Sequence, residues 1–197
     1  MNLSRRSLFV AAGGIATAAL LQPQVATAAS AIEPALLARA LAALDRHAIP
    51  NRDILAIADF SLPSSTPRFH LVDVASGSVS SHLVAHGRGS DPAHTGWLQR
   101  FSNEPRSFAT SAGAYKTEDI YIGAHGRSIR LKGLDATNDN ALSRAIVVHA
   151  AWYVSPEMIR TYRILGRSEG CFALANASLQ EVSERLGPDR LIYADKI

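Results

Sequence analysis

The sequence predicts a single-domain α+β fold that is mostly β-sheet. Short apolar runs rich in β-branched residues recur along most of the chain with turn residues between them. Only three segments carry helical signals, and no linker, repeat or low-complexity tract divides residues 29–197. A segment of this length is enough to bury one hydrophobic core.

Residues 1–28 have the three parts of an export signal. Arg5 and Arg6 stand in SRRSLF, a short apolar stretch follows at Leu8–Leu21, and Ala26-Thr27-Ala28 forms a small-x-small cleavage site. The paired arginines resemble a Tat-type signal peptide. The apolar stretch is shorter than the about 20 residues that a helix needs to span a bilayer. We therefore expect cleavage and an exported, periplasmic or cell-envelope protein, with an uncleaved anchor as the alternative.

Charge gives little reason to expect a nucleic-acid partner. The net charge of +3 includes two signal arginines, so residues 29–197 carry +1, and no run of five basic residues exists. Residues 29–50 form a predicted N-terminal helical segment, before a catalytic domain at 51–197. Within it, Glu33–His47 is the expected helix, because Pro34 suits the first turn and Leu37, Leu41 and Leu44 share a face.

Strands are expected to follow, with Ser76-Gly77 as a hairpin turn. The predicted strands are Ile54–Phe60, Phe69–Val74, Val79–Ala85, Ala114–Lys116, Ile120–Gly123, Ser128–Leu131, Ala145–His149 and Leu191–Ala194. Residues 87–106 form a long polar loop, whose length is typical of functional loops.

Two further helices are predicted in the second half of the chain. One is Pro156–Tyr162, and the other is Ser178–Leu186, where Ser178 and Glu181 form a capping box. Tyr115 and Tyr121 are expected to pack in the sheet, and Trp97 and Trp152 in the core, with a position over the mouth of a cleft as the alternative for the two tryptophans.

Cys171 is the only cysteine, and it stands in the polar, glycine-flanked stretch GRSEGCFAL. His149 lies well before it in the sequence and ends the apolar run AIVVH, where a strand would reach the rim of the core. A neighbouring imidazole can take the thiol proton and return it to a leaving amine. Spacing alone leaves the alternatives of a buried structural cysteine and a core-edge histidine open.

Metal and cofactor sites have little support in the sequence. The seven histidines include no HExxH motif and no close pair, and one cysteine cannot build a cysteine-rich zinc site. We expect neither a metal nor an organic cofactor.

A strand that ends in a histidine, an intervening segment and then Ser-x-Gly-Cys together resemble the motif of L,D-transpeptidases, the YkuD-like superfamily. The closer resemblance is to the branch of murein L,D-transpeptidase catalytic domain proteins. It rests on segments within Ala56–Ala173, in this order: IADFSLPSSTPRFHLVDV, HGRGS, FSNEPRS, GAYKTEDIYIGAHGRSIRLKGLD, RAIVVHAAWYVS and GRSEGC.

The resemblance implies a mixed β-sandwich with a few packed helices and an activity on peptidoglycan stem peptides. Cys171 would form the thioester, and His149 would be the base and then the acid. Ser168, or a nearby backbone carbonyl, would hold the imidazole. The backbone N–H groups of Gly170 and Cys171 would bind the oxyanion. The family cleaves between meso-diaminopimelate and a terminal D-alanine, and passes the acyl group to an amine of murein or lipoprotein, or to water.

The chain also departs from the family pattern. The segment between His149 and Ser168 is slightly longer than the usual spacing, Glu169 replaces a histidine, and Phe172-Ala173 lacks an arginine that would hold a substrate carboxylate. Glu169 would oppose thiolate formation if it lay close to the sulfur. Possible substitutes for the missing arginine, each with an ordinary surface arginine as its alternative, are Arg167, Arg127 and Arg130.

Other polar residues in matched loops are candidates to line the cleft, with simple solvation as the alternative. These are His86, Arg88, Asn103 and His125. Three functions follow from the sequence. They are an L,D-transpeptidase, a murein L,D-carboxypeptidase or other thiol peptidase that uses water, and a non-catalytic murein-binding domain. If His149 activates Cys171, the thiol should titrate below its free value. The sequence gives no preference for 3-3 cross-linking, lipoprotein attachment or trimming, nor for an oligomeric state.

Overall fold

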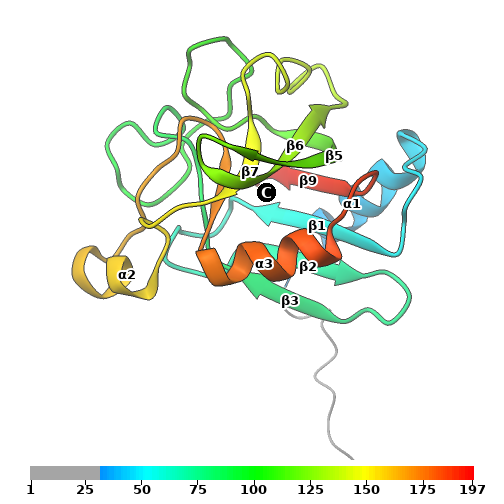
Figure 1. Ribbon diagram of the computed structural model, residues 1–197, viewed down its shortest axis with the longest axis horizontal. Coiled ribbons are helices and arrows are strands. Elements are labelled where there is room, and N and C mark those ends of the chain that lie inside the picture. The colour runs from blue at the N-terminus through cyan, green and yellow to red at the C-terminus, as the bar shows by residue number, and fades with distance from the viewer. Residues whose placement is uncertain (1–31) are drawn as a thin grey trace, which may run out of the picture.

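The computed structural model describes residues 32–197, and the predicted signal peptide lies outside the described residues. Within this range the helices are α1 (Pro34–Arg46), α2 (Pro156–Tyr162) and α3 (Asn176–Arg185) (Figure 1). The strands are β1 (Ile54–Asp59), β2 (Phe69–Asp73), β3 (Val79–His82), β4 (Val84–Ala85), β5 (Gly113–Gly123), β6 (Gly126–Gly133), β7 (Val147–Ala150), β8 (Phe172–Leu174) and β9 (Leu191–Asp195). None of the helices in residues 32–197 is long and apolar enough to cross a membrane.

The strands form one mixed sheet in the order β3-β2-β1-β9-β5-β6-β7-β8-β4. Most neighbours are antiparallel, but β1 pairs in parallel with β9, and β7 pairs in parallel with β8. The two edge strands, β3 and β4, follow each other along the chain with only Leu83 between them. The sheet must therefore curve round until its two edges approach each other.

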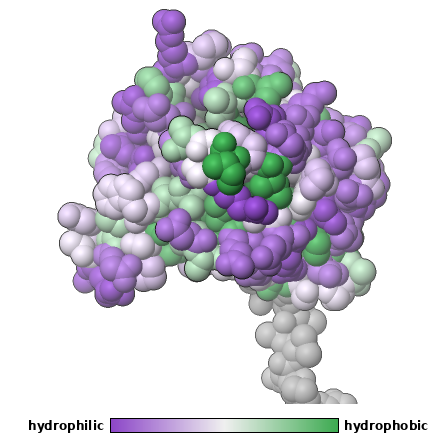
Figure 2. All heavy atoms as spheres, viewed as in Figure 1, coloured by the Kyte–Doolittle hydropathy of each residue, from purple (hydrophilic) through white to green (hydrophobic). Residues whose placement is uncertain are grey.

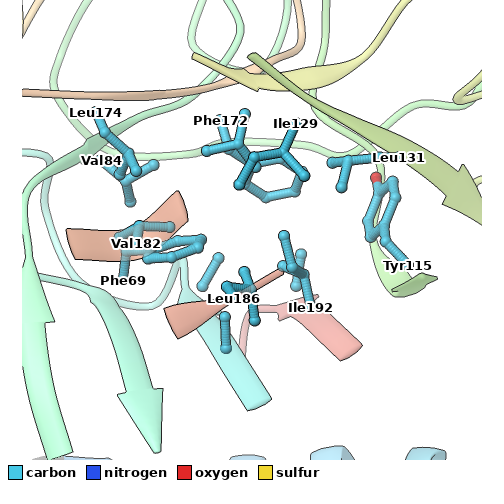
Figure 3. Packing of buried hydrophobic residues seen from close by; sticks show 14 of the residues in the cluster. Phe69, Val84, Tyr115, Ile129, Leu131, Phe172, Leu174, Val182, Leu186 and Ile192 are labelled. Carbon is cyan, nitrogen blue, oxygen red and sulfur yellow. The ribbon is translucent and has the colours of Figure 1, made fainter. Parts of the chain in front are cut away.

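The main hydrophobic core fills the inside of this curved sheet. Phe69 from β2 and Val84 from β4 belong to the same buried cluster as Tyr115, Ile129 and Phe172 from β5, β6 and β8. Figure 3 shows these side chains converging from the two halves of the sheet, which face each other as in a sandwich. The burial of Phe172, against the rings of Phe69 and Tyr115, fixes the strand that begins directly after Cys171.

Helices close the remaining faces. Alternate residues of β1 and β9, such as Leu55 and Leu191, point outward and form a second cluster with Leu36 and Leu44 of α1. Val182 of α3 belongs instead to the main core, and α3 crosses in front of the sheet in Figure 1. In the same view, hydrophilic residues cover most of the surface and hydrophobic residues form only small groups (Figure 2).

The predicted class, α+β and mostly β, is confirmed, and so are all three helices within two residues of their ends. The two strands expected at 114–116 and 120–123 are one strand, β5, with a register shift between Thr117 and Ile120. The strand expected at 79–85 is interrupted at Leu83, and β8 was not predicted.

Two expectations about side chains are wrong. The capping box at Ser178 does not form, because α3 begins two residues earlier and Glu181 instead accepts hydrogen bonds from Ser80 and Arg185. Trp97 and Trp152 are not core residues, since they are 46% and 79% exposed.

Candidate active site

The residues that lead into Cys171 form a tight loop, the nucleophile loop, which we define as residues 166–171. Gly170 has a φ of +121°, and a Cβ atom there would lie 2.9 Å from the Ala109 carbonyl oxygen. The buried Ser168 hydroxyl donates to the Cys171 carbonyl oxygen at 2.7 Å and accepts from the Gly170 N–H at 3.2 Å. The loop is therefore held by its own serine, and position 170 suits only glycine.

The HGRGS segment holds the nucleophile loop from the side. The Ser168 N–H donates to the His86 carbonyl oxygen at 3.0 Å, and the Arg88 N–H donates to the Ser168 carbonyl oxygen at 2.7 Å. Gly87 lies between these two bonds, and a Cβ atom there would be only 2.7 Å from the Gly170 nitrogen. The two segments approach so closely because position 87 has no side chain.

His149 and Cys171 lie on the same face of the sheet. In the parallel pair of β7 and β8, Val148 is opposite Phe172 and His149 is opposite Ala173. Val148 and Phe172 point into the main core. Because side chains alternate along a strand, His149 and Cys171 both point to the outer face, as diagonal neighbours on adjacent chains. The sheet thus brings together two segments that lie well apart in the sequence.

The His149 ring has a defined tautomer and a stacked partner. Its Nδ1 lies 2.9 Å from the Ala150 carbonyl oxygen, and a carbonyl can only accept, so Nδ1 carries the proton and Nε2 has the free lone pair. The His125 ring, from the turn between β5 and β6, stacks on it with centroids 4.3 Å apart. A backbone carbonyl orients the imidazole, therefore, whereas Ser168 is occupied within its own loop.

The Cys171 thiol lies near the start of β7. Its Sγ is 3.6 Å from the Ala145 carbonyl oxygen, to which it donates. Burial raises the pKa of the thiol, and the Glu169 carboxylate adds to this rise. The Val147 N–H and the Arg144 guanidinium act in the opposite direction and lower the pKa, but burial is the largest effect. No hydrogen bond joins this sulfur to His149 within residues 32–197.

Both members of the pair are held in their neutral forms. Burial lowers the pKa of His149, and the neighbouring His125 acts in the same direction. A thiol with a raised pKa beside an imidazole with a lowered pKa does not form a resting thiolate–imidazolium pair. The expectation that the thiol titrates below its free value is therefore wrong for the resting structure, because desolvation outweighs the nearby positive charge.

An open pocket of about 470 Å³ lies in front of the thiol. Its lining residues are Pro105, Arg106, Phe108, His125, Ser143, Arg144, Ala145, Glu169 and Cys171. The Arg144 guanidinium is held by hydrogen bonds to Ser102, Ser107, Ser111 and Ala109, so it is a fixed positive charge in the wall of this pocket. Sequence patterns did not single out Arg106, Phe108 or Arg144, because nothing local distinguishes them from other loop residues.

Glu169 lines the same pocket as the thiol. Its carboxylate pairs with Arg88 at 3.0 Å, and both side chains are largely exposed. The Arg88 guanidinium also lies 3.8 Å from the centre of the Phe108 ring. Glu169 is thus largely exposed and paired with Arg88, and its charge still adds to the raised pKa of the Cys171 thiol.

His86 is a structural residue beneath the site. It is 1% exposed, its Nδ1 lies 2.7 Å from Arg68 Nη2, and its Nε2 is 3.6 Å from the Asp91 carboxylate. Burial, with the Arg68 charge, lowers its pKa to about 3. This expected cleft residue instead supports the backbone that holds the nucleophile loop.

Three other expected substrate residues bind elsewhere in the protein. Asn103 donates to the Asp139 carboxylate at 2.6 Å, and Arg130 donates to Asp119 at 2.8 Å. Arg127 bonds to the Ser183 hydroxyl at 3.1 Å. The structure thus brings Ser168, Gly170, Cys171, His149 and His125 together, with Arg88 and Arg167 alongside, and leaves Asn103, Arg127 and Arg130 out of the pocket. Within residues 32–197, no three His, Cys, Asp or Glu side chains are grouped to hold a metal ion.

The fold and the site together define an α+β domain with a histidine on one strand and a cysteine directly before the parallel neighbouring strand, beside an open pocket. A family model described as "L,D-transpeptidase catalytic domain" matches residues 28–194. The chain therefore belongs to the L,D-transpeptidase catalytic domain family, as its motifs predicted. No curated protein matches the sequence.

Several solved structures are similar at low identity. The L,D-transpeptidase from Mycobacterium smegmatis is 14% identical, over 73% of this chain and 58% of that one, with a TM-score of 0.43. The L,D-transpeptidase from Xylanimonas cellulosilytica is 16% identical, over 79% and 68%, with a TM-score of 0.45. Pgp2, a helical cell shape determining protein from Campylobacter jejuni, is 11% identical, over 75% and 48%, with a TM-score of 0.47. The match spans less than two thirds of the first of these proteins.

Proposed function

We propose that this protein is an exported L,D-transpeptidase, a cysteine acyltransferase that acts on peptidoglycan stem peptides. Membership of the family supports the class of reaction. The observation that carries the proposal is that His149 lies on β7 while Cys171 directly precedes β8, the parallel neighbour of β7, with the thiol in the wall of an open pocket. Those positions match the family's nucleophile and base.

Acylation begins from the neutral pair. The donor carbonyl carbon enters the pocket, and the thiol leaves the Ala145 carbonyl by rotation about its Cα–Cβ bond. The His149 Nε2 lone pair takes the sulfur proton as the C–S bond forms. When the C–N bond breaks, the imidazolium gives that proton to the departing amine of D-alanine, which leaves a thioester on Cys171. The Ala150 carbonyl stabilises the transient charge on the ring.

The oxyanion is assigned to the backbone N–H groups of Gly170 and Cys171. In the resting structure the Gly170 N–H donates to Ser168 Oγ at 3.2 Å, which is long for such a bond. A developing oxyanion can replace that neutral acceptor, because charge-assisted hydrogen bonds are roughly twice as strong. The acyl group then passes to an amine of murein or of a lipoprotein, or to water in the carboxypeptidase alternative.

The proposed location is the periplasm or the cell envelope. It rests on the Tat-type signal peptide that the sequence predicts at residues 1–28, and on the position of murein outside the cytoplasmic membrane. Cleavage of the signal would release the mature chain from the membrane. In the alternative, an uncleaved signal would be its membrane contact.

The proposal is tested by mass spectrometry of the intact mature protein with a carbapenem as acylating probe. We expect one covalent adduct on the wild type, none on Cys171→Ala, and slow formation on His149→Ala. A tetrapeptide donor with and without an acceptor amine then separates transfer from hydrolysis. Folded wild-type protein that forms no adduct with either reagent would make this a non-catalytic murein-binding domain.

A further inference from the structure

Four hydrogen bonds to protein oxygens hold the guanidinium of Arg144 in the wall of the thiol pocket. Its Nη1 donates to the Ser102 carbonyl oxygen at 2.8 Å and to the Ser111 hydroxyl at 2.7 Å. Its Nη2 donates to the Ser107 hydroxyl at 3.2 Å and to the Ala109 carbonyl oxygen. These bonds use all the N–H groups of the two terminal nitrogens, and only the Nε–H is left. A two-pronged grip on a carboxylate needs two parallel N–H groups, so Arg144 is not arranged to hold one.

The positive charge of Arg144 has no anionic partner, because all four hydrogen-bond acceptors are neutral oxygens. None of the ion pairs among residues 32–197 includes this arginine. The Glu169 carboxylate lines the same pocket, but it is paired with Arg88 at 3.0 Å. Burial lowers the pKa of Arg144, because taking a guanidinium out of water without an anion costs free energy. The resting protein therefore retains an uncompensated, half-buried cation beside its only cysteine.

The backbone before β7 places this charge next to the nucleophile loop. Residues 140–146 make a turn that Ala145 ends with a φ of +53°, a left-handed conformation that is uncommon for a residue other than glycine. The Ala145 carbonyl oxygen accepts the hydrogen bond of the Cys171 thiol. Arg144 Nη2 lies 3.3 Å from the place that a Cβ atom at Gly170 would take. Arg144 thus adjoins both the resting acceptor of the thiol and the backbone that precedes the sulfur.

The interaction between Arg144 and Cys171 grows when the sulfur loses its proton. The guanidinium lowers the pKa of the thiol, and an ionised thiol raises the pKa of Arg144. A neutral thiol offers no net charge for the cation to attract. When His149 Nε2 takes the proton, the sulfur becomes negative, and the charge passes to the carbonyl oxygen as the C–S bond forms. A charge that is already fixed in place stabilises such a developing anion without reorganisation.

The other titratable groups around the thiol do not supply this fixed positive charge. They come from several elements and are Glu169, Arg106, His125, Tyr115, His149 and Tyr153. The Glu169 carboxylate opposes a thiolate, and burial raises the pKa of both phenols, so these are uncharged near neutral pH. Arg106 is exposed, so solvent and salt screen its charge.

We infer that Arg144 is a positioning residue whose fixed charge stabilises the anion that forms at Cys171, first on the sulfur and then on the oxygen of the tetrahedral intermediate. The second of these charges rests on the proposed function, whereas the first needs only the thiol. This role accounts for the ionisation of a buried thiol that shares its pocket with a carboxylate. It differs from the holding of a substrate carboxylate, because the terminal N–H groups of Arg144 are already used.

Two substitutions separate the charge of Arg144 from its hydrogen bonds. Arg144→Lys keeps the charge and Arg144→Gln removes it, and neither side chain can make all four bonds to residues 102–111. The first readout is the pH dependence of Cys171 alkylation by iodoacetamide, a neutral reagent without a carboxylate. The second is the rate of adduct formation with a carbapenem. The control is Arg160→Gln, because Arg160 is an exposed arginine of α2 that pairs with Glu157.

Arg144→Gln should move the alkylation curve to higher pH and lower the rate near neutral pH by about 3- to 10-fold. This is the range expected when a nearby opposite charge is lost and the more basic thiolate reacts somewhat faster. Arg144→Lys should stay within about 2-fold of the wild type, since it keeps the charge. Both variants should nevertheless lose similar stability in urea denaturation. Carbapenem acylation should fall in Arg144→Gln at least as much as alkylation, and Arg160→Gln should match the wild type in both assays.

A second pair of variants tests the same inference with Arg144 in place. Ser107 accepts a hydrogen bond from Arg144 Nη2, so Ser107→Asp would place a carboxylate against the guanidinium and compensate its charge. Ser107→Asn offers a neutral acceptor of similar shape and is the matched control. Near neutral pH, Ser107→Asp should be alkylated and acylated more slowly than Ser107→Asn.

The inference is overturned if Arg144→Gln and Arg144→Lys lower alkylation equally, since the lost hydrogen bonds would then be the cause. It also fails if both variants alkylate like the wild type while carbapenem acylation falls, because that pattern assigns Arg144 to binding the reagent. Should neither Arg144 variant fold, equal rates for Ser107→Asp and Ser107→Asn would overturn it. Wild-type protein that alkylates with the expected contrast among the variants, but forms no adduct, would refute the proposed function and leave the effect on the sulfur standing.

Discussion

Ser168→Ala should destabilise the protein, because it removes two hydrogen bonds within the nucleophile loop. The hydroxyl is 4% exposed, accepts from the Gly170 N–H and donates to the Cys171 carbonyl. Alanine leaves both groups without this partner where water has little access. At about 1–3 kcal/mol for each of these two unsatisfied groups, we expect a loss of about 2–6 kcal/mol in the free energy of unfolding.

The loss is measured by urea denaturation of the mature protein at neutral pH. For a chain of this size it corresponds to a fall in Tm of roughly 4–24 °C. Ser178→Ala is the control, because Ser178 lies within α3 rather than at its N-cap, and it should stay within about 0.5 kcal/mol of the wild type. The reasoning is refuted if Ser168→Ala is as stable as Ser178→Ala, or if it keeps the wild-type rate of thioester formation.

Three further predictions concern histidines and the thiol. Because burial raises the pKa of Cys171, the rate of its alkylation by iodoacetamide should keep rising above pH 9, and a plateau near pH 7 would instead indicate a resting ion pair with His149. Burial and Arg68 lower the pKa of His86 from 6.5 to about 3, so the unfolded chain binds more protons than the folded one between these pH values. Stability should therefore fall as the pH decreases from 6.5 toward 3. In denaturation curves, His86→Asn should weaken that dependence. His125→Phe keeps a ring stacked on His149 but removes the charge of the His125 imidazole, so it should preserve the maximal acylation rate and raise the lower pKa of the pH–rate profile. His125→Ala should reduce the maximal rate severalfold. Equal rates for both variants would contradict a positioning role for the ring.

Local signals predicted those elements whose ends are set by neighbouring residues. Pro156 fixes the start of α2. The helix α1 forms as predicted, but its buried face consists of Leu36, Ala40, Ala43 and Leu44, whereas Leu41, which was expected on that face, is 37% exposed. The start of α3 was misplaced because Ser178 looks like a cap, while tertiary contacts give Glu181 other partners. The short strand β8 was missed, since so brief a run carries no periodic pattern.

The sequence singled out the cysteine and the histidine as candidates but did not predict their surroundings. Cys171 and His149 were found from residue chemistry, strand position and the motif that they share with a family. Arg144, which lines the pocket beside Cys171, was not predicted, because its position depends on which loops meet in space. His86 was misjudged for the same reason: a histidine in a glycine-rich loop looks exposed, whereas the fold buries it against Arg68.

The bonds between residues 86–88 and Ser168 link the chemistry to the closing of the sheet. These residues follow directly on β4, the edge strand that pairs with β8, so the thiol acquires its fixed backbone only when segments from distant parts of the chain have met. Contacts of such sequence separation form late in folding. In a newly made chain, the backbone around Cys171 should therefore lack these hydrogen bonds until β8 has paired with β4.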